Sequence, residues 1–258
     1  MRFYKFRAVG KDLVGDHSLD ALLKSYAVFS SRTNFNDLFD SKIHTPRPTP
    51  GQIEDLLKRS GVKGSTDSMK SWVSSGQFTP LGLSALESFE GAFNETIDSY
   101  PIYCVSTSNN YDPLWAHYAA SHTGFCIEFE FPGAQPTQVQ YRDQLETIPL
   151  LDFLSAFYQF GSTDRGLGNR ILDALHVKLN RWSSENEYRL IAGNEIGKLP
   201  KGSKFMKVPY DPTWVKAVIF GCRTSDDVKA YIKNNLPFST EFKQAIAVKD
   251  RIELVSEA

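Results

Sequence analysis

Short stretches in which hydrophobic and polar residues alternate recur along the chain, and they predict a sheet of short strands. The clearest stretch is 125–131, where phenylalanine or isoleucine fills every second position and Cys126, Glu128 and Glu130 lie between them. This period of two predicts a strand with one buried and one solvated face. Similar patterns predict strands near 2–9, 27–30, 102–105, 139–141, 185–192, 205–208, 215–220, 245–248 and 252–255.

Other segments have the spacing of helices. Apolar residues three and four positions apart predict helices within 51–99, 149–160, 167–182 and 228–236. Ser18 and Ser225 are candidate N-caps, the pair Asp112-Pro113 is typical of a helix start, and Gly124 is a candidate C-cap.

Helices and strands do not alternate regularly, which favours an α+β fold with a mixed, mostly antiparallel sheet. We expect a single domain over 1–258 with a helical insertion at about 51–99. The insertion either covers a face of the sheet, which we favour, or acts as a lid.

Composition narrows the class of protein. Of the 258 residues, 41% are apolar and 23% charged, and the net charge is −1, so no overall basic field points to nucleic acid. The three isolated cysteines predict reduced thiols and a cytoplasmic location. We find neither a signal peptide nor an apolar run long enough to span a bilayer, so no membrane partner is expected.

Several common chemistries lack their sequence motifs. The chain contains no P-loop, no dinucleotide-binding glycine motif, no nucleophile elbow and no cysteine pair with zinc-ligand spacing. We therefore predict no metal site. A metal-dependent nuclease would need convergent acids such as Asp37, Asp40, Glu128, Glu130 and Glu185, but Glu128 and Glu130 also fit the solvated face of a strand.

The segment 182–191 concentrates polar groups at a predicted helix-to-strand junction. In a strand that starts near Glu185, the side chains of Glu185, Glu187 and Arg189 share one face. A face with three charges is a poor choice for a core, because buried charge without a partner is expensive. It suits the wall of a binding site.

Three parts of the chain, taken in order, resemble the ADP-ribosyltransferase superfamily. They are the basic and aromatic strand 4–7, the run Ser106-Thr107-Ser108, and the pair Glu185-x-Glu187. The resemblance implies a split sheet and NAD as a co-substrate. It implies that Glu187 contacts the ribose, with Glu185 as its partner and Ser106 as their support.

Cleaving the nicotinamide–ribose bond builds positive charge on the sugar, and a nearby carboxylate stabilises that charge. The expected NAD-binding residues are Tyr4, Lys5, Arg7, Asn36, Asp37, Ser108, Trp115, His117, Tyr118 and Arg189. Among them, the strand cations would lie near the phosphates and the aromatic residues would line the pocket.

Three ordered motifs over most of the chain resemble a bacterial family known as domain of unknown function 2971. They are Phe-Asn-Asp-x-Phe-Asp at 35–40, Trp-x-His-Tyr-Ala-x-x-His-x-Gly-Phe at 115–125 and Trp-x-x-Glu-x-Glu-Tyr-Arg at 182–189. Leu38 stands where the family often has proline. The family name implies no activity.

The leading hypothesis is therefore an NAD-consuming enzyme of ADP-ribosyltransferase or NAD glycohydrolase type, which by analogy would suit a toxin or phage-defence effector. The acceptor could be a protein, a nucleic acid, a small molecule or water. A second hypothesis is a non-catalytic binding or regulatory module in which the same polar residues form a structural network. A metal-dependent nuclease ranks third.

Overall fold

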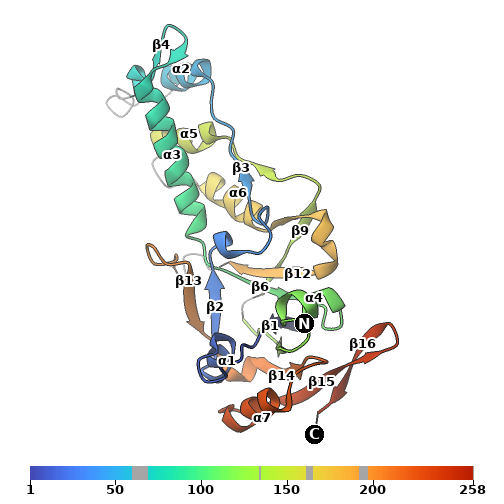
Figure 1. The fold of residues 1–258 in the computed structure, drawn as a ribbon. Helices are drawn as coiled ribbons and strands as arrows, with labels where there is room; N and C mark the ends of the chain where they lie inside the picture. The colour runs from blue at the N-terminus through green and yellow to red at the C-terminus, as the bar shows by residue number, and fades with distance from the viewer. Residues whose placement is uncertain (60–68, 134, 161–164, 192–196, 258) are drawn as a thin grey trace. The chain divides into compact units, whose positions relative to one another are not determined.

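The computed structural model describes residues 1–59, 69–133, 135–160, 165–191 and 197–257, which form two compact units (Figure 1). Unit 1 comprises 1–30, 101–139 and 181–258, and unit 2 comprises 31–100 and 140–180. The chain therefore changes unit after Ser30, Tyr100, Val139 and Asn180. We expected one domain with an insertion at 51–99; the helices of that insertion are part of unit 2, which also includes 140–180.

Unit 1 is built on a mixed, mostly antiparallel sheet of 10 strands within the described residues. Its main order is β13-β2-β6-β1-β7-β14-β15-β16, and β12 pairs with both β6 and β8. The pair β14–β15 is parallel. The strands are β1 (Phe3–Arg7), β2 (Tyr26–Ser30), β6 (Ile102–Ser106), β7 (Phe125–Phe129), β8 (Thr137–Gln138), β12 (Glu187–Ile191), β13 (Phe205–Pro209), β14 (Val215–Phe220), β15 (Glu241–Val248) and β16 (Arg251–Ser256).

The sheet divides at β6. On one side, β12 pairs with β6 along its full length. On the other side, β1 meets β6 through Tyr4 opposite Ser106, and β2 meets it through Ser30 opposite Ile102. One branch therefore continues from β1 to β7, β14, β15 and β16, and the other continues from β2 to β13.

Each face of this sheet packs on its own core. The larger core combines Phe29 of β2 and Phe125 of β7 with residues of α1 (His17–Leu23) and α7 (Asp226–Asn235). On the opposite face, Tyr4 and Phe6 pack with Trp115 of α4 (Asp112–Tyr118). Short 3-10 helices η5 (Pro212–Trp214) and η4 (Asn180–Glu185) precede β14 and β12.

Two of the expected helix starts differ in detail. The N-cap of α1 is Asp16, whose carboxylate accepts from the N–H groups of Ser18 and Leu19, so Ser18 lies inside the helix. The N-cap of α4 is Tyr111, and Asp112 is the first helical residue. The prediction for Ser225 is confirmed, because its hydroxyl caps α7.

Strand β7 is buried on both faces, so the prediction of one solvated face is wrong. The carboxylate of Glu128 is buried, and it lies 2.9 Å from the Lys243 ammonium and 3.4 Å from the Arg2 guanidinium. These cations compensate a charge that alternation alone assigned to solvent. The neighbouring Glu130 is only partly buried and pairs with Arg2 at 3.0 Å.

Gly124 does not cap α4. That helix ends at Tyr118 with Ala119 as its C-cap, and the turn after it is made by Ala120, Ser121 and His122, whose φ angles are 47°, 54° and 71°. Gly124 is required for a different reason, because a Cβ there would lie 2.1 Å from the carbonyl oxygen of Arg7. Glycine thus allows the chain to approach β1 closely as β7 begins.

Over its described residues, unit 2 contains helices and three small sheets. Its elements are η1 (Arg32–Asn34), β3 (Ile43–His44), α2 (Pro50–Arg59), η2 (Met69–Ser71), β4 (Val73–Ser74), β5 (Gln77–Phe78), α3 (Pro80–Asp98), β9 (Gln140–Arg142), β10 (Glu146–Thr147), α5 (Leu150–Phe160), α6 (Arg165–Leu175) and β11 (Val177–Leu179). β3 pairs with β10, β9 with β11, and β4 with β5. Within the expected helical insertion, residues 69–78 instead form η2 and the β4–β5 hairpin, and the helix expected over 167–182 ends at Leu175.

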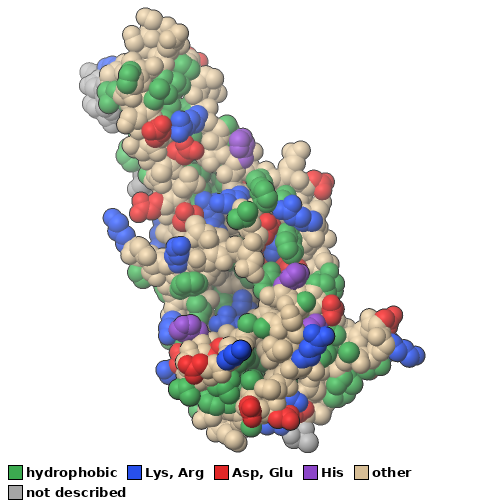
Figure 2. Space-filling view, viewed as in Figure 1, with side chains coloured by type: hydrophobic (Ala, Val, Ile, Leu, Met, Phe, Trp, Pro, Cys, Tyr) green, Lys and Arg blue, Asp and Glu red, His purple; other side chains and the backbone are tan. Residues whose placement is uncertain are grey.

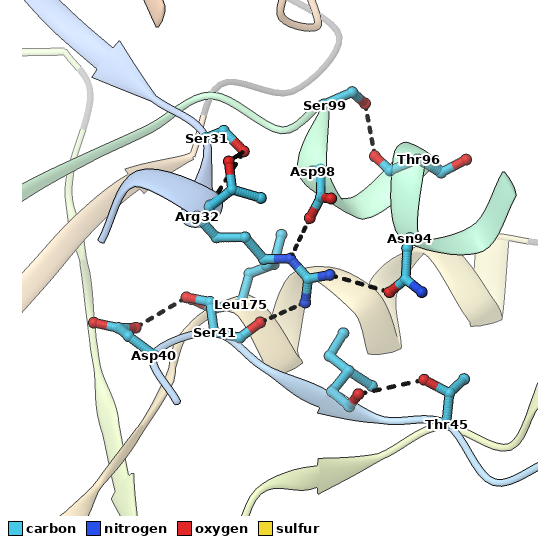
Figure 3. Close-up of polar contacts among 12 residues, drawn as sticks. Ser31, Arg32, Asp40, Ser41, Thr45, Asn94, Thr96, Asp98, Ser99 and Leu175 are labelled. Carbon is cyan, nitrogen blue, oxygen red and sulfur yellow. Dashed lines mark hydrogen bonds and ion pairs between the residues drawn. The ribbon is translucent and has the colours of Figure 1, made fainter. Parts of the chain in front are cut away.

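A buried arginine organises the polar interior of unit 2 (Figure 3). Arg32 donates from Nε to the Asp98 carboxylate at 2.7 Å, from Nη1 to the carbonyl oxygen of Ser41 at 2.8 Å, and from Nη2 to Asn94 at 3.3 Å. The arginine therefore joins the segment after η1 to the last turns of α3. Each bond is charge-assisted, which makes it stronger than a neutral one.

Candidate functional site

Three side chains form a row across neighbouring strands of unit 1. Tyr4 of β1 and Glu187 of β12 both lie opposite Ser106 of β6, on its two sides. Residues directly opposite in antiparallel strands point to the same face, so the three side chains are neighbours. The register of the three predicted strands β1, β6 and β12 thus places Tyr4, Ser106 and Glu187 side by side. We call these three residues the strand row.

The carboxylate of Glu187 is held by an arginine two residues further along the same strand. Arg189 Nε donates to Glu187 Oε1 at 2.6 Å, and the exposed fractions of the two side chains are 0% and 7%. Alternation places both on the face of Ser106. The predicted clustering of these two charges on one strand face is therefore observed, and the arginine supplies the countercharge that burial requires.

Glu185 is not part of that strand face, which corrects the expectation of a strand from Glu185 onward. It is the last residue of η4, and Asn186, with φ 46°, separates it from β12. The hydroxyl of Ser106 donates to the carbonyl oxygen of Glu185 at 2.6 Å and accepts from the N–H of Ser108 at 2.9 Å. The serine run thus fixes the backbone of this turn, and the side chain of Asn186 donates to Ser108 Oγ at 3.0 Å.

Helix α4 supplies the contacts to the side chain of Glu185. Tyr118 donates its hydroxyl to Glu185 Oε1 at 3.0 Å, and Tyr111 donates to Ser184 Oγ at 2.7 Å. The Trp-x-His-Tyr run on α4 and the Glu-x-Glu segment therefore meet in space through Tyr118. Tyr111, Ser184 and Asn186 were not among the predicted site residues, since no pattern distinguishes them from ordinary turn residues.

The other two aromatic positions of the α4 motif differ from each other. Trp115 is fully buried in the core of this face and donates from Nε1 to the carbonyl oxygen of Asn109, so it does not line a solvent-facing pocket as predicted. His117 is exposed, and its ring lies 6.4 Å from that of Trp182 in an edge-on arrangement. Helical spacing explains the difference, because positions two apart point to different sides of a helix.

The two strand cations lie on the opposite face from the strand row. Lys5 and Arg7 alternate with Tyr4 on β1, so their side chains point toward the larger core. Lys5 Nζ donates to the carbonyl oxygen of Cys104 at 2.7 Å, and burial lowers the pKa of Lys5 to about 8. Burial also raises the pKa of Tyr4, with Glu128 contributing. The structure therefore brings Tyr4 to Ser106 and Glu187 but not Lys5 or Arg7.

Asn36 and Asp37 belong to unit 2, whereas the strand row belongs to unit 1. Asn36 is exposed, and Asp37 Oδ1 accepts from the N–H of Phe39 at 3.1 Å, which closes a local turn. Nearby, buried Asp40 pairs with buried Lys178 at 3.3 Å. The Phe-Asn-Asp-x-Phe-Asp motif thus contributes to the structure of unit 2.

Neither the distribution of surface charge nor the placement of possible metal ligands indicates a second site. Positive and negative side chains are interspersed on the face shown in Figure 2. Among the residues that the structure describes, no three or more histidine, cysteine, aspartate or glutamate side chains are placed to share a metal ion. Across the same ranges, every helix is too short or too polar to cross a bilayer.

The fold and the strand row define a mixed α/β protein with a mostly antiparallel sheet and a buried carboxylate–arginine pair near its dividing point. No family model, curated protein or solved structure matches the chain.

Proposed function

We propose that unit 1 carries an NAD-consuming site of ADP-ribosyltransferase or NAD glycohydrolase type, centred on the strand row. The observation that carries the proposal is the register of Tyr4, Ser106 and Glu187 on three adjacent strands. Each of the three parts of the chain that resemble the superfamily is more than 75 residues from the next, yet one residue from each lies in the row. The division of the sheet at β6 also agrees with the split sheet that the resemblance implies.

In this proposal, Glu187 stabilises the positive charge that develops on the ribose when the nicotinamide bond breaks. Arg189 supplies a countercharge to the carboxylate and limits its rotation. Glu185 orients or deprotonates the acceptor, and Tyr118 holds its carboxylate. Ser106 is a positioning residue, because its hydroxyl binds the backbone of Glu185 rather than a carboxylate.

The test is NAD consumption by the purified full chain, wild type beside Glu187→Gln. Glu128→Gln is a matched control, because Glu128 is another buried, ion-paired glutamate in the same sheet. Each of the two substitutions removes the charge of one buried, ion-paired carboxylate. We expect NAD turnover to fall at least about 100-fold in Glu187→Gln, the usual scale for loss of a transition-state contact, and to persist in Glu128→Gln.

One observation favours a second candidate, a non-catalytic binding module. The Glu187–Arg189 pair is almost excluded from solvent, as a structural network would be. This candidate predicts that a folded wild-type chain neither binds nor consumes NAD and that Glu187→Gln changes stability alone. Turnover in the wild type would reject it, and the absence of NAD binding by a folded chain would reject the enzyme.

A further inference from the structure

The strand at one end of the unit 1 sheet has an open edge. β16 is the last strand of that sheet, and within the described residues it pairs with β15 alone (Figure 1). The strand at the other end, β13, carries Lys207 and finishes at Pro209, and both residue types discourage pairing with a further strand. In contrast, β16 contains neither lysine nor proline, and its register with β15 is regular from Arg251 to Ser256. An open edge of this kind accepts another strand.

Alternation along β16 shows which backbone groups lie at this edge. Just after the strand, the N–H of Glu257 donates to the carbonyl oxygen of Phe242 at 2.9 Å, which continues the register between β15 and β16. The hydrogen-bonding groups of an antiparallel strand point alternately to its two sides. The odd-numbered residues of β16 therefore point their backbone groups at β15, and the even-numbered residues, including Ile252 and Leu254, point theirs at the open edge.

The side chains of β16 separate into a charged pair on one face and an apolar pair on the other. Arg251 Nε donates to Glu253 Oε1 at 2.7 Å, and the two side chains are 71% and 39% exposed, so both charges are accessible. On the opposite face, Ile252 is buried in the core beside α4, and the partly buried Leu254 packs against the same core. A strand added to this edge would therefore meet opposite charges on one face and apolar side chains on the other.

The two charges distinguish between the registers in which β16 could pair antiparallel with its own copy. Such pairing forms hydrogen bonds only where edge-directed residues lie opposite each other, so the strands can slip only in steps that keep this match. Centring the pairing on Ile252 brings Arg251 of each chain opposite Glu253 of the other. One step in either direction brings Arg251 opposite Arg251 or Glu253 opposite Glu253. Opposite charges directly across stabilise a strand pair and like charges destabilise it, which favours the register centred on Ile252.

We propose that β16 is a docking edge for β16 of a second copy of this chain, paired antiparallel and centred on Ile252. The backbone groups of the two Ile252 residues bond to each other. Arg251 and Glu253 of opposite chains form pairs without backbone bonds between them, in which side chains approach most closely. A twofold contact uses the same surface of both chains, so association stops at the dimer. The contact involves few residues, so the dimer is weak and its population depends on concentration.

The experiment is sedimentation velocity of the full chain over a concentration series that reaches about 1 mM, the range in which weak contacts are populated. We expect a monomer–dimer equilibrium for the wild type. Arg251→Glu and Glu253→Arg each place like charges opposite one another on both sides of the axis, so each should associate at least about tenfold more weakly. Lys207→Glu is the matched control, because it makes the same change in net charge on the strand at the other end of the sheet, and it should associate as the wild type does.

An equal mixture of the Arg251→Glu and Glu253→Arg chains tests the register itself. In a mixed dimer, the introduced glutamate lies opposite the introduced arginine, and the native Arg251 of one chain lies opposite the native Glu253 of the other. The mixture should therefore associate about as tightly as the wild type, although each variant alone does not. A slipped register, with Arg251 opposite Arg251 or Glu253 opposite Glu253, would leave one of the two variants at the wild-type affinity.

Both variants change exposed side chains, so their circular dichroism spectra should match that of the wild type. A wild type that remains monomeric up to about 1 mM would overturn the inference, since even weak contacts are populated there. Wild-type association by either variant, or a mixture that associates no more tightly than the separate variants, would also overturn it. Three strands separate β16 from Tyr4 on β1, so the inference does not rest on the proposed NAD chemistry, and a chain that does not consume NAD should associate equally well.

Discussion

The buried pair of Glu187 and Arg189 allows a quantitative test of how the strand row is held. Arg189→Met leaves the Glu187 carboxylate without the countercharge that lies 2.6 Å away, at a position where the side chains are 7% and 0% exposed. Removing one partner of a buried ion pair costs about 3–5 kcal/mol. Replacing both with apolar residues of similar size, Glu187→Leu with Arg189→Met, should cost less than either single change, because no isolated charge is left.

The assay is urea unfolding of the wild type, the two single variants and the double variant. Tryptophan fluorescence reports mainly on unit 1, which contains Trp115, Trp182 and Trp214, whereas unit 2 contributes Trp72. A loss of about 4 kcal/mol corresponds to a midpoint lowered by about 2 M urea at a slope of about 2 kcal/mol per M.

The matched control is Arg251→Met on β16. Arg251 and Glu253 are also two residues apart on one strand and lie 2.7 Å apart, but their side chains are 71% and 39% exposed. This exposed pair should contribute less than about 1 kcal/mol. Equal costs for Arg189→Met and Arg251→Met, or a double variant whose cost equals the sum of the singles, would refute the argument from burial.

Three further predictions concern other parts of the chain. Gly124→Ala should destabilise the fold strongly, because the added Cβ would lie 2.1 Å from a backbone carbonyl of β1. In contrast, a Cβ at Gly91 in α3 meets nothing within 4 Å, so Gly91→Ala should stabilise the fold by about 1 kcal/mol. Thermal melts compare the two variants, and an unchanged melting temperature in Gly124→Ala would contradict the contact. Arg32→Met should lower the free energy of unfolding by about 3 kcal/mol, because three hydrogen bonds are lost. Arg47→Met breaks an exposed ion pair and should lower it by under about 1 kcal/mol. Similar urea midpoints for both variants would argue against the network around Arg32. Burial lowers the pKa of Lys5 to about 8, so between this pH and the ordinary lysine pKa the unfolded chain binds more protons than the folded chain. The free energy of unfolding of the wild type, relative to that of Lys5→Met, should therefore rise with pH across this window. A difference between the two proteins that does not change with pH would contradict the pKa shift.

Elements whose local pattern agrees with their packing were predictable from the sequence. The long helix α3 and the closing strands β15 and β16 occur close to where periodicity placed them. The observed class, mixed α/β with a mostly antiparallel sheet, agrees with the expected one at that level. Ser106 and Glu187 were expected to be neighbours, and their register agrees.

The errors arose where distant contacts override the local pattern. Alternation around Glu128 is the same for a solvated face and for a buried face with distant cations, and only the fold brings Lys243 and Arg2 to it. Glu185 continues the strand pattern on paper, but bonds from Ser106 and Tyr118 hold it in a 3-10 turn. In the strand 4–7 aromatic and basic residues alternate, so the pattern separates Tyr4 from Lys5 and Arg7 but does not show which of the two sets faces the strand row.

The repeated passage of the chain between the two units has a consequence for its synthesis on the ribosome. β1 and β2 emerge early, yet their neighbours β6 and β7 emerge only after the first segment of unit 2, and β12 and β13 only after its second segment. Contacts over such long sequence separations form slowly and leave strand edges exposed meanwhile. A chain that stops between Asn180 and Glu187 contains all of unit 2 but lacks the strand that completes the row beside Ser106. Premature termination would therefore release a product that retains one unit and has no assembled site.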